Sequence, residues 1–112
     1  MKIKALDVVG GVAALGREIG SSRDLIEAVR RGFTVETVDH VIASGRMTLA
    51  EVDETVIPRK TLSHRRKLGT LTMEQSDRLI RVAGVLALAE ETFGSAEKAG
   101  RWLRRPTSAL AG

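Results

Sequence analysis

Serine and threonine caps and single glycines divide this sequence into short segments whose apolar residues recur at helical spacing. A Ser or Thr side chain can accept the free N–H groups at the start of a helix, and Gly adopts the left-handed conformation that often ends one. The spacing predicts helices over residues 6–15, 23–31, 35–44, 49–54, 58–67, 73–93 and 96–104. Because no alternation of period two persists, we expect an all-α fold, a small helical bundle.

The expected helix boundaries rest on individual residues. Thr48 with Glu51, and Thr72 with Gln75, have the spacing of a capping box. The other predicted caps are Ser21 or Ser22, Thr34 and Ser95, and the predicted stops are Gly32, Gly45, Gly69 and Gly94. Pro58 suits the first turn of the helix over 58–67.

Several classes of chemistry are excluded by composition. The 112 residues include no cysteine, which removes disulfide frameworks and thiol nucleophiles. His40 and His64 are isolated, no Ser–His–Asp set or carboxylate pair stands out, and Gly10–Gly11 lacks the Lys that follows a phosphate-binding loop. We therefore expect no enzyme, metal or cofactor. No apolar run approaches the roughly 20 residues of a membrane span, and residues 1–6 do not resemble a signal peptide, so a cytoplasmic protein is expected.

Nearly all the excess positive charge lies in one segment. The net charge is +4. Residues 1–56 hold seven Lys or Arg against nine Asp or Glu, and residues 69–112 hold six against five. Residues 57–68 hold five basic residues and no acidic one. A concentrated basic patch attracts polyanions such as nucleic acid, although a solvated helix face is the commoner explanation for a basic run.

Residues 48–67 have the pattern of a helix-turn-helix, in which one short helix braces a second that enters the major groove of DNA. Four apolar residues, Leu49, Val52, Ile57 and Leu62, are the predicted core between the two helices. The predicted DNA contacts are Thr48, Arg59, Lys60, Thr61, Ser63, His64, Arg65, Arg66 and Lys67. A basic helix pair also occurs as plain structure, and Val56 stands where such turns commonly have glycine.

The C-terminal segment combines one large aromatic residue, two arginines and an uncharged apolar tail. Trp102 either packs on the long helix or anchors a partner, and an anchor of this kind is typical of interfaces. The candidate partner contacts are Trp102, Leu103, Arg104, Arg105, Pro106 and Leu110. The apolar helices over 6–15 and 35–44 exceed what so small a core can cover, which predicts a homodimer through the N-terminal half.

From Ile57 onward, several spaced motifs resemble a known family. These are Lys60-Thr61-Leu62 followed by Arg65-Arg66-Lys67, LT..QSDRL.R from Leu71 to Arg81, ALAEE.FG from Ala87 to Gly94, and A..WL..P...L.G from Ala99 to Gly112. In this order they resemble the Xre/MbcA/ParS antitoxins of bacterial type II toxin–antitoxin systems. Members of that family usually continue beyond the position of Gly112, so a shortened form is expected.

The resemblance implies two regions. Residues 1–70 correspond to an Xre-like helix-turn-helix region for DNA binding and dimerisation, and residues 71–112 to a helical region that binds the toxin. The implied partner is a RES-domain toxin, an enzyme that consumes NAD or ADP-ribosylates, and the implied second activity is repression of the antitoxin's own operon. The alternative is a helix-turn-helix transcriptional regulator without a toxin partner.

Overall fold

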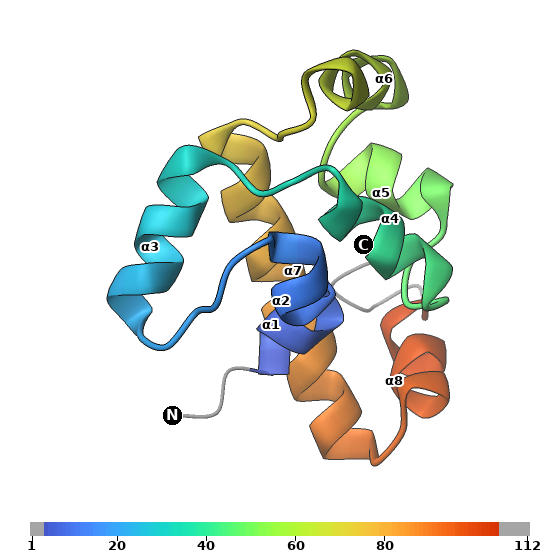
Figure 1. Cartoon of the computed structure of the whole chain (residues 1–112). Coiled ribbons are helices and arrows are strands. Elements are labelled where there is room, and N and C mark those ends of the chain that lie inside the picture. The colour runs from blue at the N-terminus through green and yellow to red at the C-terminus, as the bar shows by residue number, and fades with distance from the viewer. Residues whose placement is uncertain (1–3, 106–112) are drawn as a thin grey trace.

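The computed structural model describes residues 4–105, and every regular element in that range is an α-helix (Figure 1), which confirms the all-α prediction. The helices are α1 (Lys4–Val8), α2 (Gly11–Leu15), α3 (Ser22–Arg31), α4 (Glu36–Ala43), α5 (Leu49–Thr55), α6 (Arg59–Leu68), α7 (Met73–Phe93) and α8 (Ala96–Leu103). Within residues 4–105, no helix is both long and apolar enough to cross a membrane.

Four predicted caps are confirmed, at Ser21, Thr48, Thr72 and Ser95. In each case the side-chain oxygen accepts a backbone N–H from the first turn of the helix that follows. The Glu51 carboxylate also accepts the N–H of Thr48 at 2.9 Å, which completes a capping box at the start of α5, and α7 begins in the same way. These bonds lie within one helical turn, so the local sequence is sufficient to specify them.

The prediction of one helix over residues 6–15 is wrong. The chain turns at Gly10 and Gly11, whose φ angles are 100° and 58°, so α1 and α2 are separate. A Cβ atom at Gly10 would lie 2.5 Å from the Cβ of Ala14 and 2.9 Å from the Cγ of His40. Glycine at this position therefore permits both the turn and the packing of α2 on α4.

The prediction that Thr34 caps the next helix is also wrong. Val35 precedes α4, and no side chain caps its first turn. The Thr34 hydroxyl instead donates to the carbonyl of Ala14, and the residue forms an isolated antiparallel bridge with Thr70. The Thr34 hydroxyl therefore makes a tertiary hydrogen bond and does not cap α4.

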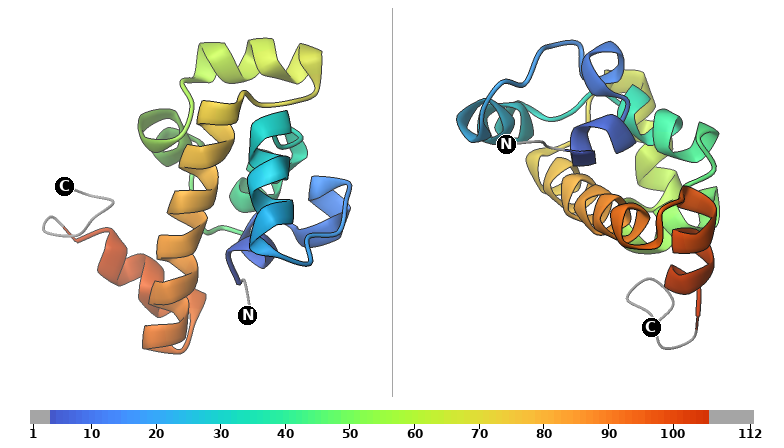
Figure 2. Two further views of the ribbon diagram at one scale, coloured as in Figure 1. Left: turned by 90° about the vertical axis from the view of Figure 1, so that its left-hand side faces the viewer. Right: turned by 90° about the horizontal axis from the view of Figure 1, so that it is seen from below.

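The long helix α7 is the central support of the molecule. Helices α1, α3 and α8 pack against it, and Figure 2 shows α6 crossing its N-terminal end and α8 at its other end. One hydrophobic cluster joins buried residues such as Val38, Met47 and Leu79. The cluster spans the sequence on both sides of residue 70, so the division into regions 1–70 and 71–112 stays a prediction about function.

Most of the apolar residues in the helices that suggested a dimer are buried within the chain, although Val12 is 57% exposed. The buried apolar residues in these two stretches are Val8, Val9, Ala14, Leu15, Val35, Val38 and Val41. The expectation that the core is too small to cover them is therefore wrong, because α1 packs on α7 and α2 packs on α4. The homodimer itself stays a prediction, and any interface must use other surfaces.

The end of α3 is held against the start of α7 through the backbone. The N–H of Leu71 donates to the carbonyl of Phe33 at 2.8 Å, and the N–H of Phe33 donates to the buried hydroxyl of Ser76 at 2.8 Å. Gly32 has a φ of 88°, and a Cβ there would lie 2.0 Å from the Leu71 carbonyl oxygen. The C-terminal end of α3 and the N-terminal end of α7 therefore lie at the same level.

Candidate nucleic-acid interface

Helices α5 and α6, joined by a short turn, occupy the segment predicted to be the helix-turn-helix pair. Val52, Ile57 and Leu62 are buried, as expected. Leu49 is the exception, since 39% of its surface is exposed, and its assignment to the core is wrong. It occupies the first position of α5.

The turn between the two helices does not need a glycine. Val56 has φ −117° and ψ −59°, a right-handed conformation open to any residue, and its side chain is buried. Its N–H donates to the carbonyl of Val52 at 2.9 Å, and its own carbonyl accepts from Arg78 of α7 at 3.2 Å. Valine at this position therefore supports the turn by packing.

The start of α6 is capped from α5. Helix α6 begins at Arg59, one residue later than predicted, so Pro58 lies at the N-cap. Its side chain cannot cap the helix. The carboxylate of Asp53 accepts the N–H of Arg59 at 2.7 Å and takes that role. This bond joins the two helices and helps to set their relative orientation. The sequence analysis missed Asp53, because its acceptor role depends on the turn that brings it to α6.

Helical geometry separates the predicted contact residues of α6 into an outward face and two sides. Leu62 is buried and marks the inward face. With about 3.6 residues per turn, Lys60, His64 and Lys67 lie on the opposite side, and Ser63 lies beside them, about 100° from Leu62; all four are exposed. Arg59 is also exposed, beside the helix start, whereas Thr61 and Arg65 are half-buried. Figure 1 shows α6 at one end of the molecule, so this outward face is open to a partner.

Two of the five basic residues are engaged within the chain. Arg65 donates through Nε to the carbonyl of Thr70 at 2.7 Å. Arg66 forms an ion pair with Asp39 of α4 at 2.7 Å, and this carboxylate raises the pKa of the guanidinium. Arg65 and Arg66 thus brace α6, whereas no ion pair involves the side chains of Arg59, Lys60 or Lys67 among residues 4–105.

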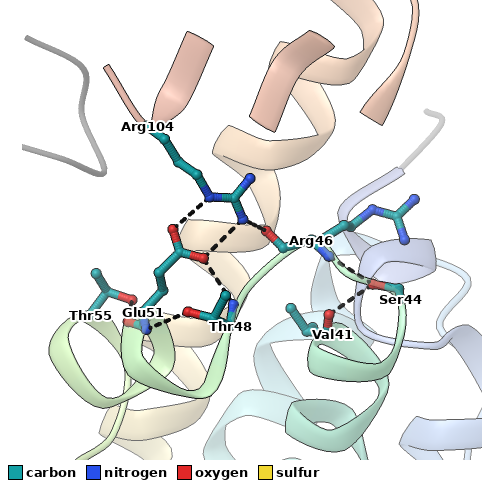
Figure 3. A network of polar contacts seen from close by, with 7 residues as sticks. All are labelled: Val41, Ser44, Arg46, Thr48, Glu51, Thr55 and Arg104. Carbon is teal, nitrogen blue, oxygen red and sulfur yellow. Dashed lines mark hydrogen bonds and ion pairs between the residues drawn. The ribbon is translucent and has the colours of Figure 1, made fainter. Parts of the chain in front are cut away.

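Thr48, the remaining predicted DNA contact, is exposed, but its side chain caps the start of α5. Its hydroxyl accepts the N–H of Glu51 at 3.1 Å. The Glu51 carboxylate also accepts two hydrogen bonds from Arg104, one from Nη2 at 2.9 Å and one from Nε at 3.0 Å (Figure 3). Arg104 also donates to the carbonyl of Arg46 at 3.3 Å. The end of α8 is thereby attached to the first turn of the helix-turn-helix.

The predicted partner contacts at the C-terminal end have different environments. Leu103 is fully buried, so its side chain belongs to the core and is not available as a surface anchor. Trp102 packs against Phe93 with ring centroids 5.4 Å apart, yet 41% of its surface is exposed. Arg105 is exposed. Pro106 and Leu110 lie outside the described residues.

Comparison with known proteins adds family evidence to this geometry. Residues 24–84, which run from α3 into α7, match the model of the antitoxin Xre-like helix-turn-helix domain. A Pseudomonas putida KT2440 protein named antitoxin Xre is 35% identical over 96 residues, covering 85% of this chain and 60% of the relative. A Yersinia enterocolitica protein of the same name is 35% identical over 104 residues, covering 87% and 70%. The chain thus spans about three fifths of the first relative's length.

Proposed function

Because this chain belongs to the antitoxin family with the Xre-like helix-turn-helix domain, we propose that it is the antitoxin of a toxin–antitoxin system and represses its own operon through DNA. The observation that carries the DNA-binding part is the outward face of α6, where Lys60, His64 and Lys67 are exposed, with exposed Ser63 beside them. This role requires no catalytic site, and it places the protein with DNA in the cytoplasm.

Five exposed polar residues of α6 each suit a particular kind of DNA contact. Arg59 and Lys60, near the start of the helix, are placed to donate to the base edges of guanine in the major groove. Ser63 and His64 can donate to either a base or a phosphate. Lys67, near the other end of the helix, is placed to contact the phosphate backbone. A symmetric operator would then be read by two copies of the chain.

Gel-shift titration of the chain's own promoter tests the DNA-binding proposal. A variant carrying Arg59→Ala, Lys60→Ala and Lys67→Ala is expected to lose affinity and to depend less steeply on salt, by about one in the log–log slope for each lost phosphate contact. The matched control is Lys98→Ala with Arg101→Ala, which removes two exposed charges from α8. If the α6 variant binds like the wild type, α6 does not read DNA.

The toxin part of the proposal names a RES-domain enzyme that consumes NAD or ADP-ribosylates. The motifs in residues 57–112 resemble antitoxins of such systems, and the relatives' names support an antitoxin role. Trp102 and Arg105 are the exposed candidates on the described surface, and Pro106 and Leu110 extend the proposed contact. Arg104 is less available because it is bonded to Glu51.

Co-purification with the product of the adjacent open reading frame tests the toxin proposal. Trp102→Ala, and separately truncation after Arg105, are expected to reduce toxin capture while DNA affinity stays close to that of the full chain. Trp102→Ala also removes the contact with Phe93, so the melting temperature of this variant is expected to fall moderately. Val12→Ala is a control, since Val12 is exposed on the distant helix α2. A chain that captures no neighbouring protein would be the helix-turn-helix regulator without a toxin.

A further inference from the structure

Helix α6 is held by little apolar packing. Of its ten residues, all within the described range, only Leu62 is buried. Packing fixes the orientation of a helix where several side chains interlock, so a helix anchored by one buried side chain is free to tilt about it. The orientation of α6 therefore depends on the connections at its two ends and on the polar bonds made there.

The two ends of α6 are attached to the molecule in different ways. At its C-terminal end, residues 69–72 lead directly into α7, and the left view of Figure 2 shows α6 crossing that end of α7. Arg65 fastens the same end, because it donates to a carbonyl in this connection at 2.7 Å. The N-terminal end carries Arg59 and Lys60, the proposed base contacts, and follows the short turn that contains Val56.

The carbonyl of Val56 in this turn accepts its hydrogen bond from a different helix. The N–H groups of Val56 and Ile57 both donate to the carbonyl of Val52, at 2.9 and 3.0 Å. In the part of the chain that the structure describes, no backbone N–H donates to the Val56 carbonyl, whereas Nη1 of Arg78 does so at 3.2 Å. Since Val56 is buried, its carbonyl needs such a partner.

Arg78 belongs to α7, the central support of the molecule, and is 22 residues away from Val56 in the chain. No ion pair within residues 4–105 involves its guanidinium, although Arg81 of the same helix pairs with Asp77 at 3.0 Å. A hydrogen bond from a charged donor is stronger than one from a neutral N–H. The bond from Arg78 thus ties the turn before α6 to the central helix.

We propose that Arg78 is a positioning residue for DNA recognition, which acts through the Val56 carbonyl to set the angle at which α6 presents Arg59 and Lys60 to the base edges. This inference deepens the proposed function, on which it rests, by placing a determinant of sequence specificity outside α6.

Tilting of α6 affects the two kinds of DNA contact unequally. A base contact requires its donors to be held within about 0.5 Å of the productive position. The attraction of Lys and Arg to phosphates acts over a screening length of about 8 Å and tolerates a tilt. A loosened α6 therefore loses sequence preference and keeps its general attraction to DNA.

Arg78→Met removes the donors and keeps an aliphatic side chain, and Arg81→Met is the matched control because it removes the same charge from the same helix. Gel-shift titrations compare the promoter with an unrelated duplex of equal length. Arg78→Met is expected to lose about tenfold or more in affinity for the promoter but less than about twofold for the unrelated duplex, with an unchanged salt slope. Arg78→Lys, which keeps a charged donor, is expected to recover most of the loss.

A measurement without DNA follows the position of α6 directly. The sequence contains no cysteine, so Lys60→Cys with Leu88→Cys provides two exposed sites for a pair of spin labels on α6 and α7. Adding Arg78→Met is expected to broaden or shift the distribution of distances between the labels, whereas adding Arg81→Met is not. Circular dichroism checks that both variants fold.

The positioning role is overturned if Arg78→Met binds the promoter as tightly as Arg81→Met does, or if the label distances do not change. Equal losses on both duplexes, with a salt slope reduced by about one, also overturn it, because Arg78 would then contact a phosphate directly. If the wild type binds no promoter DNA while the label distances change only with Arg78→Met, the proposed function fails and the control of α6 by Arg78 stands.

Discussion

Arg104 donates two hydrogen bonds to the carboxylate of Glu51, although 53 residues separate them in the chain. Arg104 follows α8, and Glu51 lies in the first turn of α5, where it also accepts from the cap residue Thr48. Gly100 leaves room for this geometry, since a Cβ there would lie 2.7 Å from an Arg104 nitrogen. The pair thus attaches the C-terminal helix to the start of the helix-turn-helix.

Removing this pair is expected to have a measurable but small effect on stability. Arg104→Ala should lower the free energy of unfolding by about 0.5–1 kcal/mol, because the pair is bidentate but partly exposed to solvent. Urea denaturation measures the change, and a double-mutant cycle with Glu51→Gln isolates the coupling. Arg105→Ala is the control and should stay within about 0.5 kcal/mol of the wild type. A coupling of zero would show that the pair does not contribute.

The same carboxylate makes stability depend on pH. Arg104 lowers the pKa of Glu51, with a further contribution from the N–H of Thr48, and burial acts in the opposite direction. A carboxyl whose pKa is lower in the folded state stabilises the fold above about pH 4.5 and loses that effect as pH falls further. Glu51→Gln keeps the capping box but loses the charge. The stability difference between wild type and Glu51→Gln should therefore shrink from neutral pH to about pH 3.

Asp39 partly neutralises the positive charge of α6 through its ion pair with Arg66. Asp39→Asn removes the negative charge with little change in shape, so we expect tighter promoter binding by about two- to fivefold, and a steeper salt dependence. Glu36→Gln is the matched control, since Glu36 is an exposed acidic residue of the same helix without a described ion pair. Equal effects of the two variants would mean that only net charge matters.

Gly32 is expected to be more sensitive to substitution than Gly45. Gly32→Ala places a methyl group against the Leu71 carbonyl at a positive φ, so we expect a loss of about 3 kcal/mol or more in the free energy of unfolding. Gly45 also has a positive φ, of 81°, but open space around it, so Gly45→Ala should cost about 1–2 kcal/mol. Thermal melting of the two variants compares them, and equal losses would contradict a steric role for Gly32.

Ser76 of α7 is fully buried and makes two hydrogen bonds, one to the segment after α3 and one within the first turn of its own helix. It accepts the N–H of Phe33 and donates to the carbonyl of Thr72, each at 2.8 Å. Ser76→Ala leaves the Phe33 N–H unsatisfied in the core, which is expected to lower stability by about 1–3 kcal/mol. Hydrogen exchange should also speed up at that amide. The control is Thr92→Ala, which removes a hydroxyl bonded to a backbone carbonyl on the exposed side of α7.

Features that depend on residues within one helical turn could be predicted from the sequence. The capping boxes at Thr48 and Thr72 are of this kind, and the predicted range of α7 agrees with the structure. The errors occur where a distant contact competes with the local preference. Thr34 has the chemistry of a cap but donates to Ala14. Gly10 lies inside the helix predicted over residues 6–15, whereas in the structure it has a φ of 100° and lies close to His40 of α4, so the chain turns there.

The features of the candidate DNA-binding site also separate into those that the local sequence specifies and those that the tertiary structure decides. The sequence by itself determined that α6 is helical, that it carries five basic residues, and that its buried side is at Leu62. Only the tertiary structure decided which of those charges are free. Arg66 pairs with a carboxylate 27 residues away in the chain, whereas Lys60 and Lys67 face outward. The physical reason is that an ion pair requires a separation of a few ångströms, and the packing of helices, not their order in the chain, determines which charges come that close.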